Sequence, residues 1–192
     1  FMAINTSTLA DEVGGFGDWI EIYNAGDEPI SLSGFYLTDK FETPSKFPLP
    51  DTILQAGGFA LIWADNDPEQ GPFHTNFNLD GYGEEIGLFY KNGDNYSQVD
   101  KLKFYMQRED VSYGRYTDGG SFFYPMFKPT PLVPNLYDTV KDTPTDKLRV
   151  FPNPAVDKIK IQSDLLISGF TFQIYSLFGE RIANIVFSGN EN

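Results

Sequence analysis

The stretch DWIEIYNAGDEPISLSGFYLTD, residues 18–39, constrains the fold most, because its apolar and polar residues alternate with a period of two. Alternation of this kind is typical of β-strands, whose successive side chains point to opposite faces. In the first half, Trp19, Glu21 and Tyr23 share one face and two isoleucines share the other. Three interpretations of the aromatic face stay open: a packed wall of a β-sandwich, a platform for a ligand, or the setting of a catalytic carboxylate.

The same alternation recurs along the chain and predicts an all-β fold. No segment keeps a helical period over the roughly 10–15 residues that would predict a helix. Asn92 with Gly93, and Asp118 with Gly119, predict hairpin turns, because these residues tolerate positive φ. About seven short strands with regular turns indicate a sandwich or a barrel. We expect strands at residues 1–5, 19–24, 35–38, 59–64, 85–90, 98–104 and 112–116.

The chain changes character at FKPTPLVPN, residues 127–135, whose three prolines do not suit a central strand. Residues 136–147 are polar and without a pattern, as in a linker. Alternation resumes in residues 148–192. A chain of 192 residues is long enough for one domain and a smaller one. We therefore predict a first domain at 1–135, a linker at 136–147, and a second, incomplete β-sandwich module at 148–192.

The formal net charge of −13 argues against one class of partner. Residues 148–192 hold four basic and four acidic side chains, so the acidic surplus lies upstream of them. A field of this sign repels phosphates and anionic lipids, and we expect no nucleic-acid partner. The sequence has no cysteine, and therefore no disulfide. It also has no apolar run of the about 18 residues that a membrane-spanning helix requires, so we expect no transmembrane segment.

Within residues 1–135, the segment 18–39 is followed by AGGFALIWAD, HTNFNL, GEEIGLF and DVSYGRYTDG. These motifs, in this order, resemble those of lamin-tail domains, and the segment 18–39 is similar to the signature of that family. PTPLVPN is similar to the proline-rich exit of the bacterial branch, with Leu132 at the usual place of a glycine. The resemblance implies an immunoglobulin-like β-sandwich in a mostly non-enzymatic family. We therefore expect a non-catalytic extracellular recognition or spacer module, not an enzyme, with a protein or glycan ligand at the cell surface.

In the last part of the chain, VFPNPAVDKIKI and IYSLFGERI follow the predicted linker in that order. The two motifs resemble those of the C-terminal sorting domain of type IX secretion substrates. It implies contact with the secretion machinery through residues 148–192, and a protein that is secreted or held at the outer-membrane surface of a Gram-negative bacterium. Because that family continues through further strands, we expect a truncated domain. The tail is then expected to be either disordered or paired with a neighbouring molecule, in self-association through four apolar residues without cover: Ile182, Ile185, Val186 and Phe187.

Candidates for metal and proton chemistry are few. His74 is the single histidine, and no cysteine accompanies it, so we expect a structural role. Asp65, Asp67 and Glu69 stand at alternate positions, as in a calcium loop, but the glycine and glutamate that complete such a loop are missing. These residues predict either a calcium site or a solvated acidic loop, and no other cofactor is expected. A glycine-rich loop supplies a second set of carboxylates: Asp11, Glu12 and Asp18.

Glu21 needs a partner if it lies half-buried between two aromatic residues. Arg115 is the expected partner, because a guanidinium can pair a carboxylate through two hydrogen bonds and lie against an aromatic ring. This ion pair favours the packed-wall interpretation. The alternative function is a carbohydrate-binding module of a larger secreted hydrolase, since exposed tryptophan and tyrosine rings stack on sugars. Its candidate aromatic residues are Trp19, Trp63, Tyr82 and Tyr124.

Overall fold

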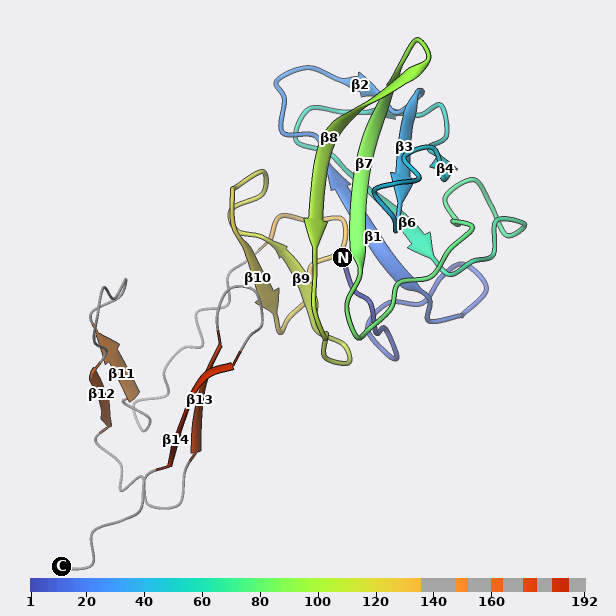
Figure 1. Cartoon of the computed structure of the whole chain (residues 1–192). Coiled ribbons are helices and arrows are strands. Elements are labelled where there is room, and N and C mark those ends of the chain that lie inside the picture. Colours follow the sequence, from blue (N-terminus) through green and yellow to red (C-terminus); the bar gives the residue numbers. More distant parts are fainter. Residues whose placement is uncertain (136–147, 152–159, 164–170, 176–180, 187–192) are drawn as a thin grey trace, which may run out of the picture. The chain divides into compact units, whose positions relative to one another are not determined.

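A computed structural model of the chain describes residues 1–135 in full and, beyond them, the backbone of four short strands (Figure 1). The chain divides into two compact units, Phe1–Asp138 and Thr139–Asn192. This division falls within the range predicted as a linker, residues 136–147, which lies outside the described residues. The linker and its bounds therefore stay a prediction.

The first unit consists of antiparallel β-strands. Its strands are β1 (Asp18–Tyr23), β2 (Ile30–Ser31), β3 (Phe35–Thr38), β4 (Phe47–Pro48), β5 (Ile53–Leu54), β6 (Phe59–Ala64), β7 (Glu85–Asn92), β8 (Asn95–Lys103), β9 (Ser112–Arg115) and β10 (Phe123–Met126). One sheet has the order β4-β3-β7-β8, and β1 pairs with β6, β2 with β5, and β9 with β10. Among the described residues there is no helix, and so none that could span a membrane.

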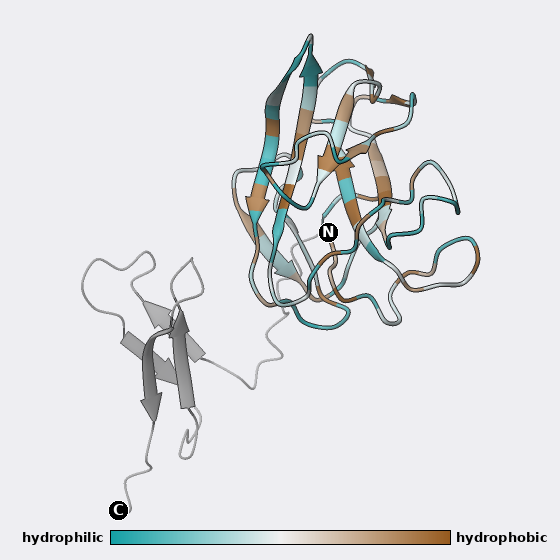
Figure 2. Cartoon of the chain, turned by 45° about the vertical axis from the view of Figure 1, so that its right-hand side comes forward, coloured by the Kyte–Doolittle hydropathy of each residue, from teal (hydrophilic) through white to brown (hydrophobic). Residues whose placement is uncertain are grey.

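The core lies between the β1–β6 pair and the four-stranded sheet. Ile20 and Ile62 of the pair share one buried cluster with Leu37 and Ile86 of the sheet. Figure 2 shows apolar and polar residues alternating along several of these strands, as is typical of sheets that pack on a core. Two sheets around one core form the predicted all-β, immunoglobulin-like sandwich.

The outer face of β1 is covered as well. Trp19 lies opposite Trp63 in the β1–β6 register, and the two side chains form a second buried cluster with Met2. Trp19 is 2% exposed and Trp63 7%. The packed-wall interpretation is therefore right for this part of the face.

The strand predicted at residues 1–5 is wrong. Met2 forms only an isolated bridge to Trp19, and side chains then bind the backbone that follows. The Asn5 amide donates to the carbonyl groups of Leu9 and Gly17, at 2.6 and 2.8 Å. Such side-chain bonds compete with a strand ladder, and here they form a loop instead.

The other six predicted strands form, with bounds that differ by at most a few residues. Both predicted hairpins are confirmed: β7 pairs with β8 and β9 with β10, and Gly93 and Gly119 have positive φ, at 61° and 73°. Four strands were not predicted. Three of them, β2, β4 and β5, are only two residues long, and β10 contains Pro125.

In the second unit, β11 (Leu148–Phe151) pairs with β12 (Lys160–Ser163), and β13 (Thr171–Tyr175) pairs with β14 (Arg181–Val186). Both pairs are antiparallel. The expected exposure of Ile182, Ile185, Val186 and Phe187 concerns side chains outside the described residues. Self-association through them stays a prediction.

Candidate functional site

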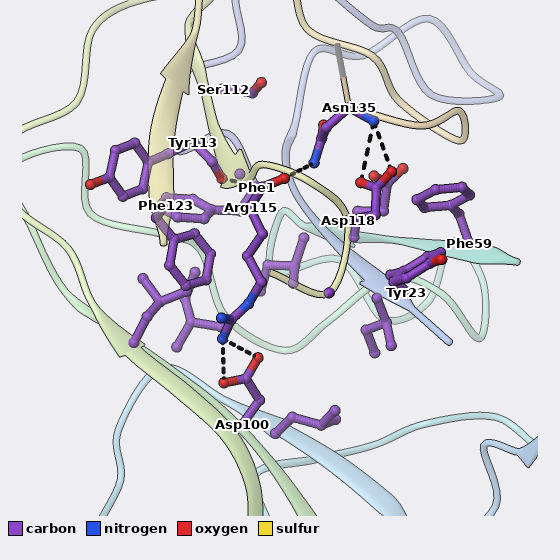
Figure 3. Close-up of a pocket in the computed structure, with 18 of the residues that line it drawn as sticks. Phe1, Tyr23, Phe59, Asp100, Ser112, Tyr113, Arg115, Asp118, Phe123 and Asn135 are labelled. Atoms are coloured by element: carbon purple, nitrogen blue, oxygen red, sulfur yellow. Dashed lines mark hydrogen bonds and ion pairs between the residues drawn. The ribbon is translucent and has the colours of Figure 1, made fainter. Parts of the chain in front are cut away.

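A cavity of about 410 Å³ lies in the first unit, bordered by β1, β8 and β9 (Figure 3). We call it the β1–β9 cavity. Its volume falls within the range of small-ligand pockets. Its apolar lining includes Ile20, Ile22, Ile86, Leu88 and Leu102. Its polar lining includes Glu21, Asp100, Arg115, Asp118 and Asn135.

Arg115 makes three side-chain hydrogen bonds at this cavity, and none of them is to Glu21. Its Nη2 donates to both carboxylate oxygens of Asp100 at 2.8 Å, and its Nη1 donates to the carbonyl of Gly120 at 2.6 Å. The guanidinium lies 4.3 Å from the centre of the Phe123 ring. The predicted Glu21–Arg115 ion pair is therefore wrong. The β9–β10 register places Arg115 beside Phe123, and from there its side chain reaches Asp100 in β8 (Figure 3).

Glu21 obtains a backbone donor rather than a basic side chain as its hydrogen-bond partner. Its carboxylate accepts a hydrogen bond from the N–H of Leu132, in the proline-rich segment. Burial raises the pKa of Glu21, and the hydrogen bond from Leu132 only partly offsets that rise. The need for a partner was predicted, but a backbone N–H from a distant segment carries no side-chain signal in the sequence.

Asn135 closes one end of the cavity. Its backbone N–H donates to the Asp118 carboxylate at 3.1 and 3.2 Å, and its side-chain amide donates to the carbonyl of Arg115 at 2.9 Å (Figure 3). Thr130 bonds the Asn135 side chain at 3.0 Å. The proline-rich segment is thus fixed to the β9–β10 hairpin by polar contacts.

Aromatic rings form a continuous group along β9. Tyr113 stacks on Phe123 with ring centres 5.8 Å apart, and it meets the edge of Phe1 at 5.9 Å. Phe1 in turn packs against Phe104 at 4.7 Å. The β1–β9 cavity therefore combines fixed rings with hydrogen-bonding groups, as binding sites for small ligands and peptides do.

Comparison with known families decides the identity of the first unit. Residues 4–104, more than half of the chain, match the family model described as the Lamin Tail Domain. The chain belongs to the lamin tail domain family. Residues 149–192 match the Secretion system C-terminal sorting domain, which marks the chain as part of a secreted protein. No curated protein and no solved structure matches the chain.

His74 of the lamin tail domain is held between two carboxylates. Its side chain is 1% exposed; Nδ1 lies 2.6 Å from Asp65 and Nε2 lies 3.0 Å from Glu12. Burial lowers the pKa of His74, but the bonds to the two carboxylates outweigh burial, so the pKa lies above its usual value. Both nitrogens then donate, as an imidazolium requires. The charged ring joins the glycine-rich loop of Glu12 to the end of β6.

The residues of the predicted calcium site are not brought together. Asp65 faces His74, while Asp67 and Glu69 are exposed. Glu12 and Asp65 bond opposite nitrogens of the imidazole, so the ring separates the two carboxylates. Within residues 1–135 and the four described strands that follow, no three acidic, histidine or cysteine side chains gather as a metal site would require.

The candidate sugar-binding residues of the lamin tail domain differ in their exposure to solvent. Trp19 and Trp63 are buried, and that prediction is wrong for both, because a ring packed on both faces cannot stack on a sugar. Tyr82 is 82% exposed, and Tyr124 is partly exposed. The alternation predicted a strand at residues 19–24, and β1 (Asp18–Tyr23) lies there. It did not predict that Met2 covers Trp19 on the outer face of this strand.

Proposed function

We propose that the lamin tail domain of this chain is a non-catalytic recognition module, which the sorting domain delivers to the cell surface through the type IX secretion machinery. The β1–β9 cavity carries this proposal. A spacer needs only a stable fold, whereas this domain keeps a cavity of about 410 Å³ lined by both apolar and hydrogen-bonding residues. Placing Glu21 and Asp118 at such a cavity has a desolvation cost that a bound ligand can offset.

Two observations support a non-catalytic role. The single histidine is buried, with Asp65 and Glu12 at its two nitrogens, so it is not available as a general base. Both matched families are non-catalytic. The net charge of −13 further favours a protein or glycan ligand over nucleic acid.

Binding to the purified chain tests the proposal. Extended peptides and oligosaccharides are titrated by calorimetry against the unaltered chain, an Ile22→Trp variant that fills the cavity, and an Ile53→Trp control. Ile53 is 56% exposed in β5 and is a matched strand position that does not line the cavity. We expect saturable binding of one ligand class, lost in Ile22→Trp and kept in Ile53→Trp. Binding that survives Ile22→Trp, or no binding by either class, would contradict the proposal, as would turnover of any peptide or polysaccharide tested.

Export is tested separately. Removing residues 149–192 is expected to leave the protein inside a host that has the secretion system, whereas the intact chain reaches the medium or the cell surface. Equal export of both forms would refute the role of the sorting domain.

A further inference from the structure

A second hollow of the lamin tail domain lies where the β7–β8 hairpin begins and ends, opposite its turn. Its volume is about 710 Å³, and its lining includes Asp80, Tyr82, Glu84, Met106 and Gln107. The two lining segments meet because residues 80–84 lead into β7 and residues 106–107 follow its antiparallel neighbour β8 (Figure 1). We call this hollow the Tyr82 groove. It shares no lining residue with the β1–β9 cavity.

The backbone around Tyr82 is fixed, whereas its side chain is open to solvent. The Tyr82 N–H donates to Oδ1 of Asp80 at 2.8 Å, and the Asp80 N–H donates to Oε2 of Glu84 at 3.1 Å. The N–H of Gln107 donates to the carbonyl of Gly81 at 2.8 Å, which joins this loop to the segment after β8. Tyr82 is nevertheless 82% exposed. A flat group that packs on its ring therefore meets a backbone that is already ordered, which reduces the entropic cost of binding.

Two carboxylates at the groove have oxygens to spare. Hydrogen bonds within residues 1–135 engage Oδ1 of Asp80 and Oε2 of Glu84, and none engages the second oxygen of either group. Burial raises the pKa of Glu84, and the charges of Asp39 and Asp80 raise it further. Lys46 acts in the opposite direction, but its Nζ already donates to both oxygens of Asp39, at 2.5 and 2.6 Å. In the described part of the chain, no lysine or arginine lines the groove.

The open ring and the two carboxylates together select the chemistry of a ligand. The carboxylates repel anions, and a neutral sugar that stacks on the ring has no charge to complement theirs. A guanidinium is planar, so it can lie on the Tyr82 ring while its N–H fork reaches the free carboxylate oxygens. Arg115 makes both contacts elsewhere in this domain: its guanidinium lies 4.3 Å from the centre of the Phe123 ring and donates to both oxygens of Asp100 at 2.8 Å.

We propose that the Tyr82 groove binds an arginine side chain of another protein, with the guanidinium stacked on Tyr82 and hydrogen-bonded to Asp80 and Glu84. This surface goes beyond the recognition function of the β1–β9 cavity and does not depend on it. The aliphatic part of the arginine packs on Met106, which is 71% exposed. The partner is a protein with a basic surface, which the net charge of −13 also attracts over a longer range.

An NMR titration of the intact chain with Nα-acetyl-arginine amide tests the proposal. One side chain makes few contacts, so we expect the Tyr82 and Met106 resonances to shift with a Kd of about 1–10 mM. Nα-acetyl-lysine amide should bind at least about threefold more weakly, because an ammonium does not stack on a ring. The uncharged citrulline derivative should bind at least about tenfold more weakly. Free L-arginine should also bind more weakly than the amide, because the groove repels its α-carboxylate, and this separates a protein side chain from the free amino acid.

Isosteric variants test the assigned contacts. Asp80→Asn combined with Glu84→Gln removes both charges and keeps an oxygen acceptor for each loop hydrogen bond, so the loop stays folded. We expect binding of the arginine probe to weaken about fivefold or more. Asp27→Asn with Glu28→Gln is the matched control, because it removes two exposed charges outside the groove and should change binding far less. Tyr82→Leu should weaken binding about threefold, whereas Tyr82→Phe keeps the ring and the affinity.

The proposal is overturned if the arginine probe does not shift Tyr82 or Met106, or if the lysine probe binds equally well. It is also overturned if free L-arginine binds better than the amide, or if the double variant of the groove loses no more affinity than its control. If a neutral methyl pyranoside shifts these resonances and the arginine probe does not, the groove is a sugar site and the proposal is wrong. Ile22→Trp should leave probe binding unchanged, so failure of the recognition function and failure of this proposal are distinguishable.

Discussion

Arg115 and Asp100 are joined by two hydrogen bonds of 2.8 Å, which connect β9 to the outermost strand of the four-stranded sheet. The Asp100 side chain is 50% exposed, so we expect this pair to contribute only about 0.5–1 kcal/mol of coupling in a double-mutant cycle of Arg115→Ala and Asp100→Ala. The losses of unfolding free energy caused by Glu21→Gln and Arg115→Ala should instead add in the double variant to within about 0.5 kcal/mol. If Arg115 couples more strongly to Glu21 than to Asp100, the Glu21–Arg115 ion pair exists after all.

Leu132 adopts a backbone conformation that favours glycine, with φ at 62°. This conformation costs an L-residue roughly 1–2 kcal/mol, and the Leu132 side chain is largely exposed. Replacing it by glycine should raise the free energy of unfolding by about 0.5–1 kcal/mol, after the greater flexibility of unfolded glycine is subtracted. Urea denaturation measures the change. Leu132→Ala is the control and should give no gain, because alanine keeps the strain.

Trp19 combines a large buried ring with a polar group that has no partner. Its Nε1 is buried and makes no hydrogen bond within the described residues. Trp19→Ala should therefore cost about 3–5 kcal/mol in stability. Trp19→Phe keeps most of the packing and removes the unpaired N–H, and it should cost only about 1 kcal/mol. Equal losses for the two variants would show that the indole nitrogen is bonded in solution.

His74 is expected to make the glycine-rich loop sensitive to pH. Its folded pKa lies above the usual value of about 6.5, so its stabilising effect is complete below pH 6.5 and is lost as the pH rises through the folded pKa. Glu12 should be released first, because its bond is longer and its side chain more exposed than that of Asp65. The protection factors of the Val13 and Gly15 amides, from NMR hydrogen exchange corrected for intrinsic base catalysis, should therefore fall on the alkaline side. His74→Gln should remove this pH dependence.

The pKa of Asp18 is raised, whereas a carboxylate with a cationic partner usually has a lowered pKa. Burial raises its pKa to about 6, although backbone hydrogen bonds from Asn5 and Leu79 lower it. Between pH 4 and 6 the folded state holds more protons than the unfolded state, so the contribution of Asp18 to stability falls as the pH rises through this window. A rise of this size would represent roughly 3 kcal/mol at a fully buried site, and solvent screening reduces it to about 1 kcal/mol at the partly exposed Asp18. Asp18→Asn should recover that amount at pH 7 and flatten the profile between pH 4 and 6.

The sequence was most informative where a residue type dictates the backbone. The turns at Gly93 and Gly119, and the long alternating strands, follow from local chemistry. The two-residue strands β2, β4 and β5 do not, because they are paired by the surrounding sandwich and show no period of their own.

The candidate site was harder to predict, because its contacts come from segments far apart in the chain. Alternation placed Trp19, Glu21 and Tyr23 on one face, but it carried no information on what covers that face. Met2 covers Trp19, and the N–H of Leu132 meets Glu21. Opposite charge alone predicted Arg115 as the partner of Glu21, and the sequence does not show that the Arg115 guanidinium bonds Asp100 instead.

The hydrogen bonds between Phe1 and Tyr113 join residues that are 112 positions apart in the chain. Closing so long a loop costs entropy before any contact forms, and folds that depend on such contacts are slow to reach the native state. The β7–β8 hairpin, which reverses the chain between Asn92 and Asn95, should form much earlier. Between the formation of this hairpin and the pairing of Phe1 with Tyr113, β1 and β9 have unpaired edges. An unpaired edge can bind a strand of a neighbouring nascent chain. The domain is therefore expected to aggregate most readily from its late folding intermediate.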